Sequence, residues 1–255
     1  MGSLKFGVQL CQEHTSIDAL RAAWQFADRL GVDSIWVWDH FFPLTEGGNG
    51  SHLEGWTLLA AMAAETSRAR LGVLVSGNPY RNPDLLADMA RTADHISGGR
   101  VILGIGAGWS PRDHKEYGYT LGSRRERLRA LEASLVRIKR RLAELDPKPV
   151  GELPILVGGG GERVTLRLVA EHAQIWNFAA GPERFAVKRR VLDEWCHKVG
   201  RDPAEIIRTV LLTDPRSIAD LDRYVQAGAQ HIFLSLRHPF NLGPVAALIL
   251  SERRR

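Results

Sequence analysis

A histidine at the end of a short apolar segment is the first residue whose chemistry could serve a reaction. His40 follows the apolar segment 34–37 and is directly preceded by Asp39. A carboxylate beside an imidazole can hold one ring tautomer while the imidazole donates to a bound ring or substrate. The same pattern also fits a histidine that only closes the rim of a barrel, so spacing alone leaves both interpretations open.

Two glycine-rich turns could hold a phosphate. Residues 158–161 are four consecutive glycines between a predicted strand and a helix expected to begin at Glu162, so bare N–H groups and the helix dipole could converge on an anion. Arg163 could add a charged donor. Such turns also serve close packing alone, and the usual phosphate site of a barrel follows strands seven and eight rather than five. The second turn, residues 104–108, favours the phosphate interpretation.

Three tryptophans, Trp38, Trp109 and Trp176, fall at the ends of predicted strands. Large flat side chains at these places would line a substrate pocket suited to a planar heterocycle, although rim tryptophans can equally cover a barrel. The sequence lacks the histidine pairs and clustered carboxylates of metal-dependent barrel hydrolases. Its two cysteines, Cys11 and Cys196, have no zinc-ligand spacing, so no metal site is expected.

The elements that must position these residues alternate between short β-branched segments and amphipathic helices. This alternation is typical of a parallel sheet with crossover helices, and eight such pairs favour a closed barrel. The predicted fold class is therefore α/β, a (β/α)8 TIM barrel, formed by residues 1–255 as a single domain. The eight predicted strands are residues 5–10, 34–37, 71–75, 101–105, 155–157, 175–178, 207–212 and 231–234.

Capping residues mark several of the expected helix starts. Ser123 with Glu126 and Asp202 with Glu205 each place a side-chain acceptor at the cap and a carboxylate three residues later. Asn82 precedes a proline, which is harmless at the first helical position because its missing N–H would have no partner there. The sequence therefore predicts helices that begin after each of these three caps.

Composition excludes several classes of partner. Of 255 residues, 44% are hydrophobic and 25% are charged, which is ordinary for a globular protein. The formal charge of +5 is spread along predicted helices rather than gathered in one dense patch, so no nucleic-acid partner is expected, although a basic barrel mouth would favour an anionic cofactor. Without a signal-peptide core or a long apolar segment, the expected location is cytoplasmic, with no membrane contact.

Several motifs resemble those of the bacterial luciferase-like monooxygenase family, and within it those of the F420-dependent oxidoreductases. The resemblance covers residues 5–177 and weakens afterwards. It rests on WDHF at 38–41, LGVLVSGNPYRNP at 71–83, ISGGR at 96–100, GIGAGW at 104–109, EYG at 116–118 and PILVGG at 154–159.

The resemblance implies a luciferase-like barrel with a flavin or deazaflavin ring across the strand ends and its tail phosphate on the glycine turns. His40 would be the catalytic residue beside the reactive ring, and a bulge with a non-prolyl cis peptide would fall between Leu74 and Asn78. The residues expected to bind the cofactor are His40, Ser76, Gly77, Asn78, Gly106, Ala107, Gly108, Gly158, Gly159, Gly160, Gly161 and Arg163.

Two departures from the family pattern bear on the substrate. Trp109 occupies the place where the similar sugar-phosphate dehydrogenases carry a proton-donating glutamate, so glucose-6-phosphate is not the expected substrate. Residues 143–154 are shorter than the insertion that covers the active site in many members. The pocket is therefore expected to be open, or closed by a partner subunit.

The leading hypothesis is an enzyme that transfers a hydride between coenzyme F420 and a small organic substrate. One alternative is an FMN-dependent monooxygenase that works with a separate reductase, and another is a non-catalytic flavin-binding protein. The expected partners are a small-molecule substrate, a flavin or F420 reductase and a second copy of the chain in a homodimer. The sequence names neither the substrate nor the direction of the reaction.

Overall fold

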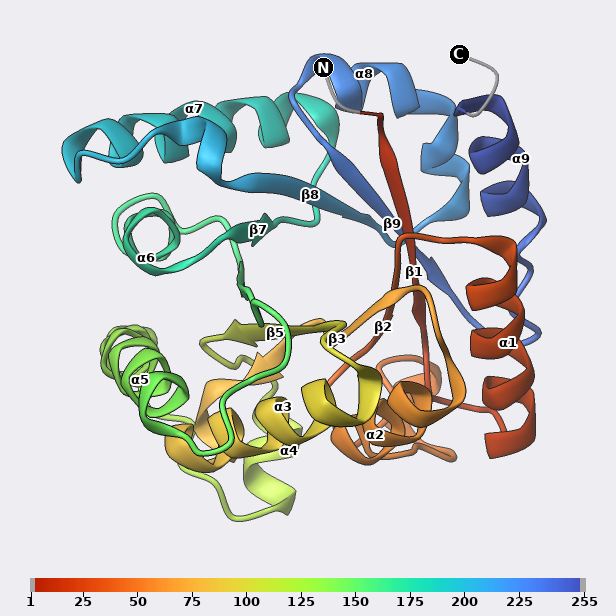
Figure 1. The fold of residues 1–255 in the computed structure, drawn as a ribbon, viewed down its shortest axis with the longest axis horizontal. Coiled ribbons are helices and arrows are strands. Elements are labelled where there is room, and N and C mark those ends of the chain that lie inside the picture. Colours follow the sequence, from red (N-terminus) through yellow and green to blue (C-terminus); the bar gives the residue numbers. More distant parts are fainter. Residues whose placement is uncertain (1–2, 253–255) are drawn as a thin grey trace.

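Parallel strands form one closed barrel at the centre of the molecule (Figure 1). The computed structural model describes residues 3–252. The strand order is β3-β2-β1-β9-β8-β7-β6-β5-β4, and the pairing of β3 with β5 closes the ring. Because β3 and β4 share one position beside β5, the predicted (β/α)8 TIM barrel is confirmed. The strands are β1 (Lys5–Leu10), β2 (Ser34–Val37), β3 (Arg70–Val73), β4 (Ser76–Gly77), β5 (Val101–Gly106), β6 (Ile155–Gly158), β7 (Ile175–Asn177), β8 (Ile207–Leu212) and β9 (His231–Leu236).

The third predicted strand is divided, which the prediction of one strand over residues 71–75 missed. The break falls at Leu74 and Val75, which are joined by a cis peptide bond inside the segment where the family resemblance predicted one. Glycines of β5 make room for this bulge. A Cβ at Gly104 would lie 2.1 Å from the Val73 carbonyl oxygen, and one at Gly106 would lie 2.7 Å from a Val75 methyl carbon.

Helices follow the strands and cover the outside of the barrel (Figure 1). The longest, α5, packs beside α3 and α6, and α6 packs beside α7. The α-helices are α1 (Ile17–Leu30), α2 (Gly55–Glu65), α3 (Pro83–Ser97), α4 (Pro111–Glu116), α5 (Arg124–Glu144), α6 (Thr165–His172), α7 (Pro182–Lys198), α8 (Leu221–Gln226) and α9 (Gly243–Glu252). Short 3-10 helices are η1 (Glu46–Gly48), η2 (Asn78–Tyr80), η3 (Pro203–Glu205) and η4 (Pro215–Asp220).

The predicted caps hold with one correction. Ser123 and Glu126 form a reciprocal capping box at α5, and the Asn82 side chain accepts from the backbone at the start of α3. Asp202 also accepts a backbone hydrogen bond, but it caps only the single 3-10 turn of η3 rather than an α-helix. The helix expected to begin at Glu162 begins three residues later as α6, because the glycine run continues into a turn.

Apolar side chains fill the lower part of the barrel interior. Trp36 and Phe233 lie with ring centroids 4.9 Å apart, and Leu74, Ile102 and Leu156 pack with them. This layer closes the barrel below the bulge and leaves the carboxyl ends of the strands open for ligands, which is where barrels of this type bind them. Within residues 3–252, no helix combines the length and apolar character needed to cross a membrane.

Candidate functional site

A cavity of about 400 Å³ lies at the carboxyl ends of the strands. We call it the barrel cavity. Its walls come from the carboxyl-terminal parts of the strands at six strand positions and from the loops that follow most of them, as expected of a barrel site. The lining residues are Asp39, His40, Leu74, Val75, Ser76, Gly77, Tyr80, Gly106, Ala107, Gly108, Trp109, Gly158, Gly159, Asn177, Phe178, Ala179 and Leu211. Eight of the residues expected at the cofactor are in this set: His40, Ser76, Gly77, Gly106, Ala107, Gly108, Gly158 and Gly159.

A buried carboxylate holds His40 at the edge of this cavity. His40 Nδ1 lies 2.6 Å from Asp113 Oδ2, and Asp113 is only 1% exposed on the short helix α4. The Phe41 amide donates to the other carboxylate oxygen over 3.2 Å, and the Tyr80 hydroxyl donates to Oδ2 over 3.1 Å. Asp113 therefore connects the loop after β2 with η2 and fixes the imidazole between them.

The charge states of Asp113 and Tyr80 select one tautomer of His40. Burial opposes ionisation of Asp113, but the hydrogen bonds from His40 and the Phe41 amide outweigh it and hold the pKa of Asp113 below its usual value. Burial, with the neighbouring carboxylate, raises the pKa of Tyr80, so its hydroxyl stays protonated and donates. An ionised carboxylate only accepts hydrogen bonds, so Nδ1 of His40 carries the hydrogen and Nε2 is the nitrogen left for a ligand.

Asp39 does not hold His40, contrary to the interpretation of the sequence. Both side chains line the barrel cavity, but they have different hydrogen-bond partners. Asp39 Oδ2 accepts instead from the Gly77 amide over 2.8 Å and from Arg81 over 2.6 Å. These bonds fix the loop after the bulge as a wall of the cavity. Asp39 Oδ1 is buried and has no hydrogen-bond partner within residues 3–252.

Only one of the three predicted tryptophans lines the cavity. Trp109 is 61% exposed at the rim, with its ring centroid 5.2 Å from that of His40. Trp38 is buried beside the site and donates from Nε1 to His52 Nε2 over 2.8 Å. Burial, with the nearby His40, lowers the pKa of His52 to about 4, so this acceptor nitrogen stays unprotonated at neutral pH.

Trp176, expected at the substrate pocket, does not line the barrel cavity. Side chains alternate along a strand, and Trp176 of β7 points outward to the helices, where it stacks on Phe185 with centroids 5.0 Å apart. It is fully buried, and its indole N–H donates to the Gly159 carbonyl over 2.8 Å. Trp176 therefore supports the glycine run from behind. Its neighbour Asn177 faces the cavity instead.

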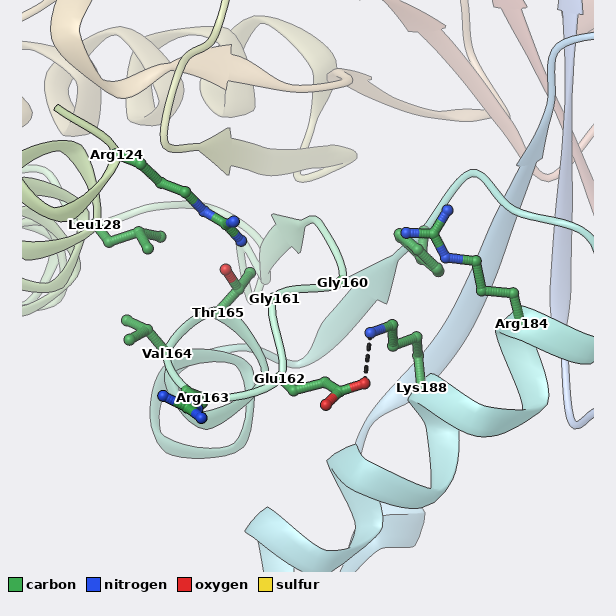
Figure 2. Close-up of a pocket in the computed structure, with 11 residues that line it drawn as sticks. Arg124, Leu128, Gly160, Gly161, Glu162, Arg163, Val164, Thr165, Arg184 and Lys188 are labelled. Atoms are coloured by element: carbon green, nitrogen blue, oxygen red, sulfur yellow. Dashed lines mark hydrogen bonds and ion pairs between the residues drawn. The ribbon is translucent and has the colours of Figure 1, made fainter. Parts of the chain in front are cut away.

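A second cavity of about 630 Å³ adjoins the first, and we call it the basic pocket (Figure 2). Phe178 lines both cavities, and the glycine run passes from the barrel cavity at Gly158 and Gly159 into the basic pocket at Gly160 and Gly161. The lining residues are Arg124, Leu128, Gly160, Gly161, Glu162, Arg163, Val164, Thr165, Phe178, Arg184 and Lys188. Of the remaining expected cofactor residues, Arg163 lines this pocket, whereas Asn78 is buried at the start of η2 and lines neither cavity.

The glycine run is shaped to let another group approach its backbone. Gly159 has φ of 126°, a conformation that favours glycine. A Cβ at Gly160 would lie 2.5 Å from the Phe178 ring, and one at Gly161 would lie 2.8 Å from Thr165 Oγ1. The next helix, α6, has no side-chain cap at Val164, so its first backbone N–H groups are not taken by a capping side chain. Such a helix start is suited to a phosphate.

Several residues of the site were missed by the interpretation of the sequence. Asp113 and Tyr80 come from segments far from His40 in the chain, and no spacing rule connects them. Arg184 and Lys188 are one helical turn apart on α7, a spacing that places both on one face once that face is known to meet the glycine run. Arg124, at the start of α5, carried no signal of its own.

The chain forms a closed barrel with a cavity at the carboxyl ends of its strands and a basic pocket beside it. This arrangement is typical of barrel enzymes and of other barrel proteins that bind small ligands. The chain belongs to the luciferase-like monooxygenase family, whose sequence profile matches residues 4–241. The membership predicted from the motifs is thereby confirmed.

Two curated relatives illustrate the range of the match. An uncharacterised protein of Mycobacterium tuberculosis is 29% identical over 199 residues, which cover 72% of this chain and 70% of that protein. The F420-dependent glucose-6-phosphate dehydrogenase of Amycolatopsis mediterranei is 40% identical over 84 residues, which cover 32% of this chain and 25% of that enzyme.

Two solved structures share the fold. An F420-dependent secondary alcohol dehydrogenase in complex with an F420–acetone adduct aligns with a TM-score of 0.83 and 18% identity, covering 95% of this chain and 96% of that one. The oxygenating constituent of 3,6-diketocamphane monooxygenase from Pseudomonas putida, in complex with FMN, aligns with a TM-score of 0.66 and 18% identity, covering 88% of this chain and 75% of that one. Oxidoreductases with F420 and monooxygenases with FMN therefore both occur among the neighbours of this fold.

Proposed function

We propose that this protein is an F420-dependent oxidoreductase that transfers a hydride between the cofactor and a small organic substrate. One observation carries the proposal: the glycine run joins a cavity suited to a flat ring to a pocket suited to anions. A cofactor that consists of a flat heterocycle, a short chain and a phosphate has the same order of parts. The similarity in fold to an F420-dependent alcohol dehydrogenase supports the proposal.

The residues present fit such a cofactor. The orphaned, buried Asp39 Oδ1 in the wall of the barrel cavity can accept a hydrogen bond from a ring N–H, which would relieve the cost of leaving it unpaired. The backbone at Gly160 and Gly161 and the uncapped start of α6 can receive the phosphate. The bound deazaflavin would supply a two-electron hydride donor or acceptor.

The protein's own part in the reaction is to hold the substrate, exclude water and move a proton. Leu74, Val75 and Leu211 give the barrel cavity an apolar inner wall that keeps water from the ring. His40 presents Nε2 at the mouth, where it can exchange a proton with a polar atom of the substrate. Trp109, beside His40 at the rim, would cover the substrate from the solvent side.

The FMN-dependent monooxygenase remains the second candidate, because the barrel cavity and the phosphate cradle would suit FMN as well and a neighbour of this fold binds FMN. A non-catalytic flavin carrier is a weaker candidate. A carrier has no need of an imidazole held in one tautomer by a buried carboxylate, as His40 is. The homodimer, the separate reductase and the cytoplasmic location stay predictions.

Fluorescence titration of the purified protein with F420 and with FMN tests the proposal. We expect micromolar or tighter binding of F420 and weaker binding of FMN, followed by oxidation of reduced F420 in the presence of enones, ketones or nitro compounds. Binding of FMN alone, with consumption of oxygen when the flavin is reduced, would establish the second candidate instead. Binding of F420 without turnover of any substrate would leave the carrier.

A further inference from the structure

A separate cavity of about 340 Å³ lies at the amino ends of the strands, opposite the barrel cavity. We call it the amino-end cavity. Its lining includes the first residues of β1, β3, β7, β8 and β9, which the closed barrel brings together. Its volume is within the range of small-ligand sites, roughly 300–1,000 Å³. Barrels of this type bind their substrates at the carboxyl ends, so the amino-end cavity lies outside the site of the proposed reaction.

One layer of apolar side chains separates the two cavities. Leu74 lines the barrel cavity and packs in the same cluster as Ile102 and Ile175, which line the amino-end cavity. Trp36 and Phe233 complete this layer, and both are fully buried. A ligand in the amino-end cavity therefore cannot reach a cofactor in the barrel cavity.

The neutral polar groups beside this layer are satisfied within the protein. Trp36 Nε1 donates to Ser34 Oγ over 2.7 Å, and Ser34 Oγ lies 3.1 Å from His231 Nε2. Burial lowers the pKa of His231 to about 3, so the imidazole is neutral and can accept from the Ser34 hydroxyl. These three side chains satisfy one another, and the charged group of a ligand would be held at the mouth of the cavity instead.

Three cations lie at this mouth without carboxylate partners. The side chains of Lys5, Arg68 and Arg70 form no ion pair or hydrogen bond within the described part of the chain, and the buried Arg70 Nε is left as an unsatisfied donor. Asp33, the carboxylate of the lining, accepts instead from the Phe6 amide over 2.8 Å. Three cations and one carboxylate leave two positive charges in excess.

Other arginines at this end of the barrel are bonded within the protein. Arg100, just before β5, donates to four carbonyl oxygens. Arg208, near the start of β8, donates to Asp193 and to two carbonyl oxygens. Arg70 holds a similar place at the start of β3 without such acceptors. A guanidinium that is not engaged in this way is suited to bind a carboxylate ligand through two parallel hydrogen bonds.

We propose that the amino-end cavity binds a small monocarboxylate with a compact apolar body. The carboxylate would lie at the mouth against Arg68 and Arg70, and the apolar body would contact Ile175 and Ile207 inside. Ile207 is 38% exposed, so it offers apolar surface that such a body would cover and that a purely inorganic anion would leave in water. This site goes beyond the proposed function and does not depend on which cofactor the barrel cavity binds.

The charge and the apolar body should contribute separately to the affinity. Lys5 and Arg68 are exposed, so their attraction for a carboxylate is screened by water and by salt. Together with Arg70 they should give the acid about a tenfold advantage over a neutral ligand of the same shape. For a ligand of this size we expect a Kd on the order of 1 mM at low salt.

Titration of the full-length protein, labelled at the isoleucine methyl groups and followed by NMR, tests the proposal. Cyclohexanecarboxylate has both the charge and the apolar body, cyclohexanecarboxamide lacks the charge, and acetate lacks the body. We expect the acid to shift the signals of Ile102, Ile175 and Ile207, and the amide and acetate to bind about tenfold more weakly or less. Ile105, further along β5 and outside the cavity, should be unaffected.

The double variant Arg68→Gln, Arg70→Gln should bind the acid no more tightly than the amide and keep its affinity for the amide. Arg29→Gln is the matched control, because Arg29 is an exposed arginine in the last turn of α1, at the same end of the barrel, but does not line the cavity. Equal affinity of the unmodified protein for acid and amide, an advantage that survives in the double variant, or shifts confined to isoleucines outside the cavity would overturn the inference. The proposed function would stand in each case, because the apolar layer separates the two cavities.

Discussion

His40 Nδ1 and Asp113 Oδ2 lie 2.6 Å apart although the two residues are 73 positions apart in the chain. The contact joins the loop after β2 to α4, and its buried carboxylate decides which nitrogen of the imidazole faces the cavity. Asp113 can affect the reaction without touching a ligand. It acts as a positioning residue, because a histidine that is free to rotate or to change tautomer presents Nε2 correctly only part of the time.

Replacing Asp113 by asparagine should lower kcat by about 10-fold to 100-fold, because the amide keeps the shape but loses the charge that holds the Nδ1–H tautomer. The affinity for the cofactor, measured by fluorescence, should change by less than about twofold. His40→Ala should lower hydride transfer at least as much. Steady-state and single-turnover oxidation of reduced F420 measure both effects.

A double variant separates positioning from general damage to the structure. If Asp113 acts only through His40, then Asp113→Asn added to His40→Ala should cause no further loss of rate. A further large loss in the double variant, or a cofactor affinity that falls with kcat, would show that Asp113 supports the fold of the site and not the chemistry of His40.

The glycine run gives a second prediction. Gly160→Ala places a methyl group 2.5 Å from the Phe178 ring, so this ring, which lines both cavities, must shift and change their shape. We expect the affinity for phosphate-bearing cofactors to fall about tenfold or more, as two binding contacts are disturbed together. Gly181→Ala, at the cap of α7, is the control, since its nearest neighbour beyond the adjoining residues would be 4.0 Å away and its φ suits alanine. Equal affinities for the two variants would show that the cradle is not at the phosphate.

The ISGGR motif gives a third prediction, and it concerns stability rather than binding. The half-buried Arg100 guanidinium donates to the carbonyl oxygens of Ala63, Thr66, Ala69 and Ser97 at 2.7–3.0 Å, which ties the segment after α2 to the end of α3. A lysine ammonium cannot reproduce this planar set of donors. Arg100→Lys should lower the free energy of unfolding by about 2–4 kcal/mol, measured by urea denaturation.

The corresponding control is Arg125→Gln, because Arg125 is exposed and pairs with no residue of the described range. Its substitution should change the free energy of unfolding by less than about 0.5 kcal/mol. If Arg100→Lys were equally mild, the hydrogen bonds at the start of β5 would contribute little net stability, and the motif would need another explanation.

The comparison of sequence and structure separates what local patterns reveal from what only packing reveals. Most strand positions and the capping box at Ser123 follow from short-range spacing, and the structure places them as expected except for the division of the third strand into β3 and β4. The outward orientation of Trp176 depends on which strand residue faces the barrel axis, a choice that a three-residue strand does not reveal. The pairing of Asp113 with His40 is a tertiary contact, so no local pattern in the sequence encodes it.

A buried histidine at the opposite end of the barrel gives the last prediction. His231 opens β9, and its Nε2 lies 3.1 Å from Ser34 Oγ beside the Phe233 ring. Burial, with a smaller contribution from Lys5, lowers the pKa of His231 from 6.5 to about 3. Below about pH 6.5, His231 binds a proton in the unfolded chain but stays neutral in the folded protein. The free energy of unfolding therefore falls as the pH is lowered from 6.5 toward 3.

By pH 5, His231 alone should lower the free energy of unfolding by about 2 kcal/mol, since each pH unit below the pKa of the unfolded chain contributes about 1.4 kcal/mol. Urea unfolding of the unmodified protein and of His231→Gln between pH 7.5 and pH 5 measures it. The variant should be less stable at neutral pH, because it disturbs the Ser34 contact, but its stability should fall less steeply with acid. Parallel curves for the two proteins would mean that His231 is protonated in the fold, and that the acid sensitivity comes from other groups such as His52, whose pKa is also lowered by burial.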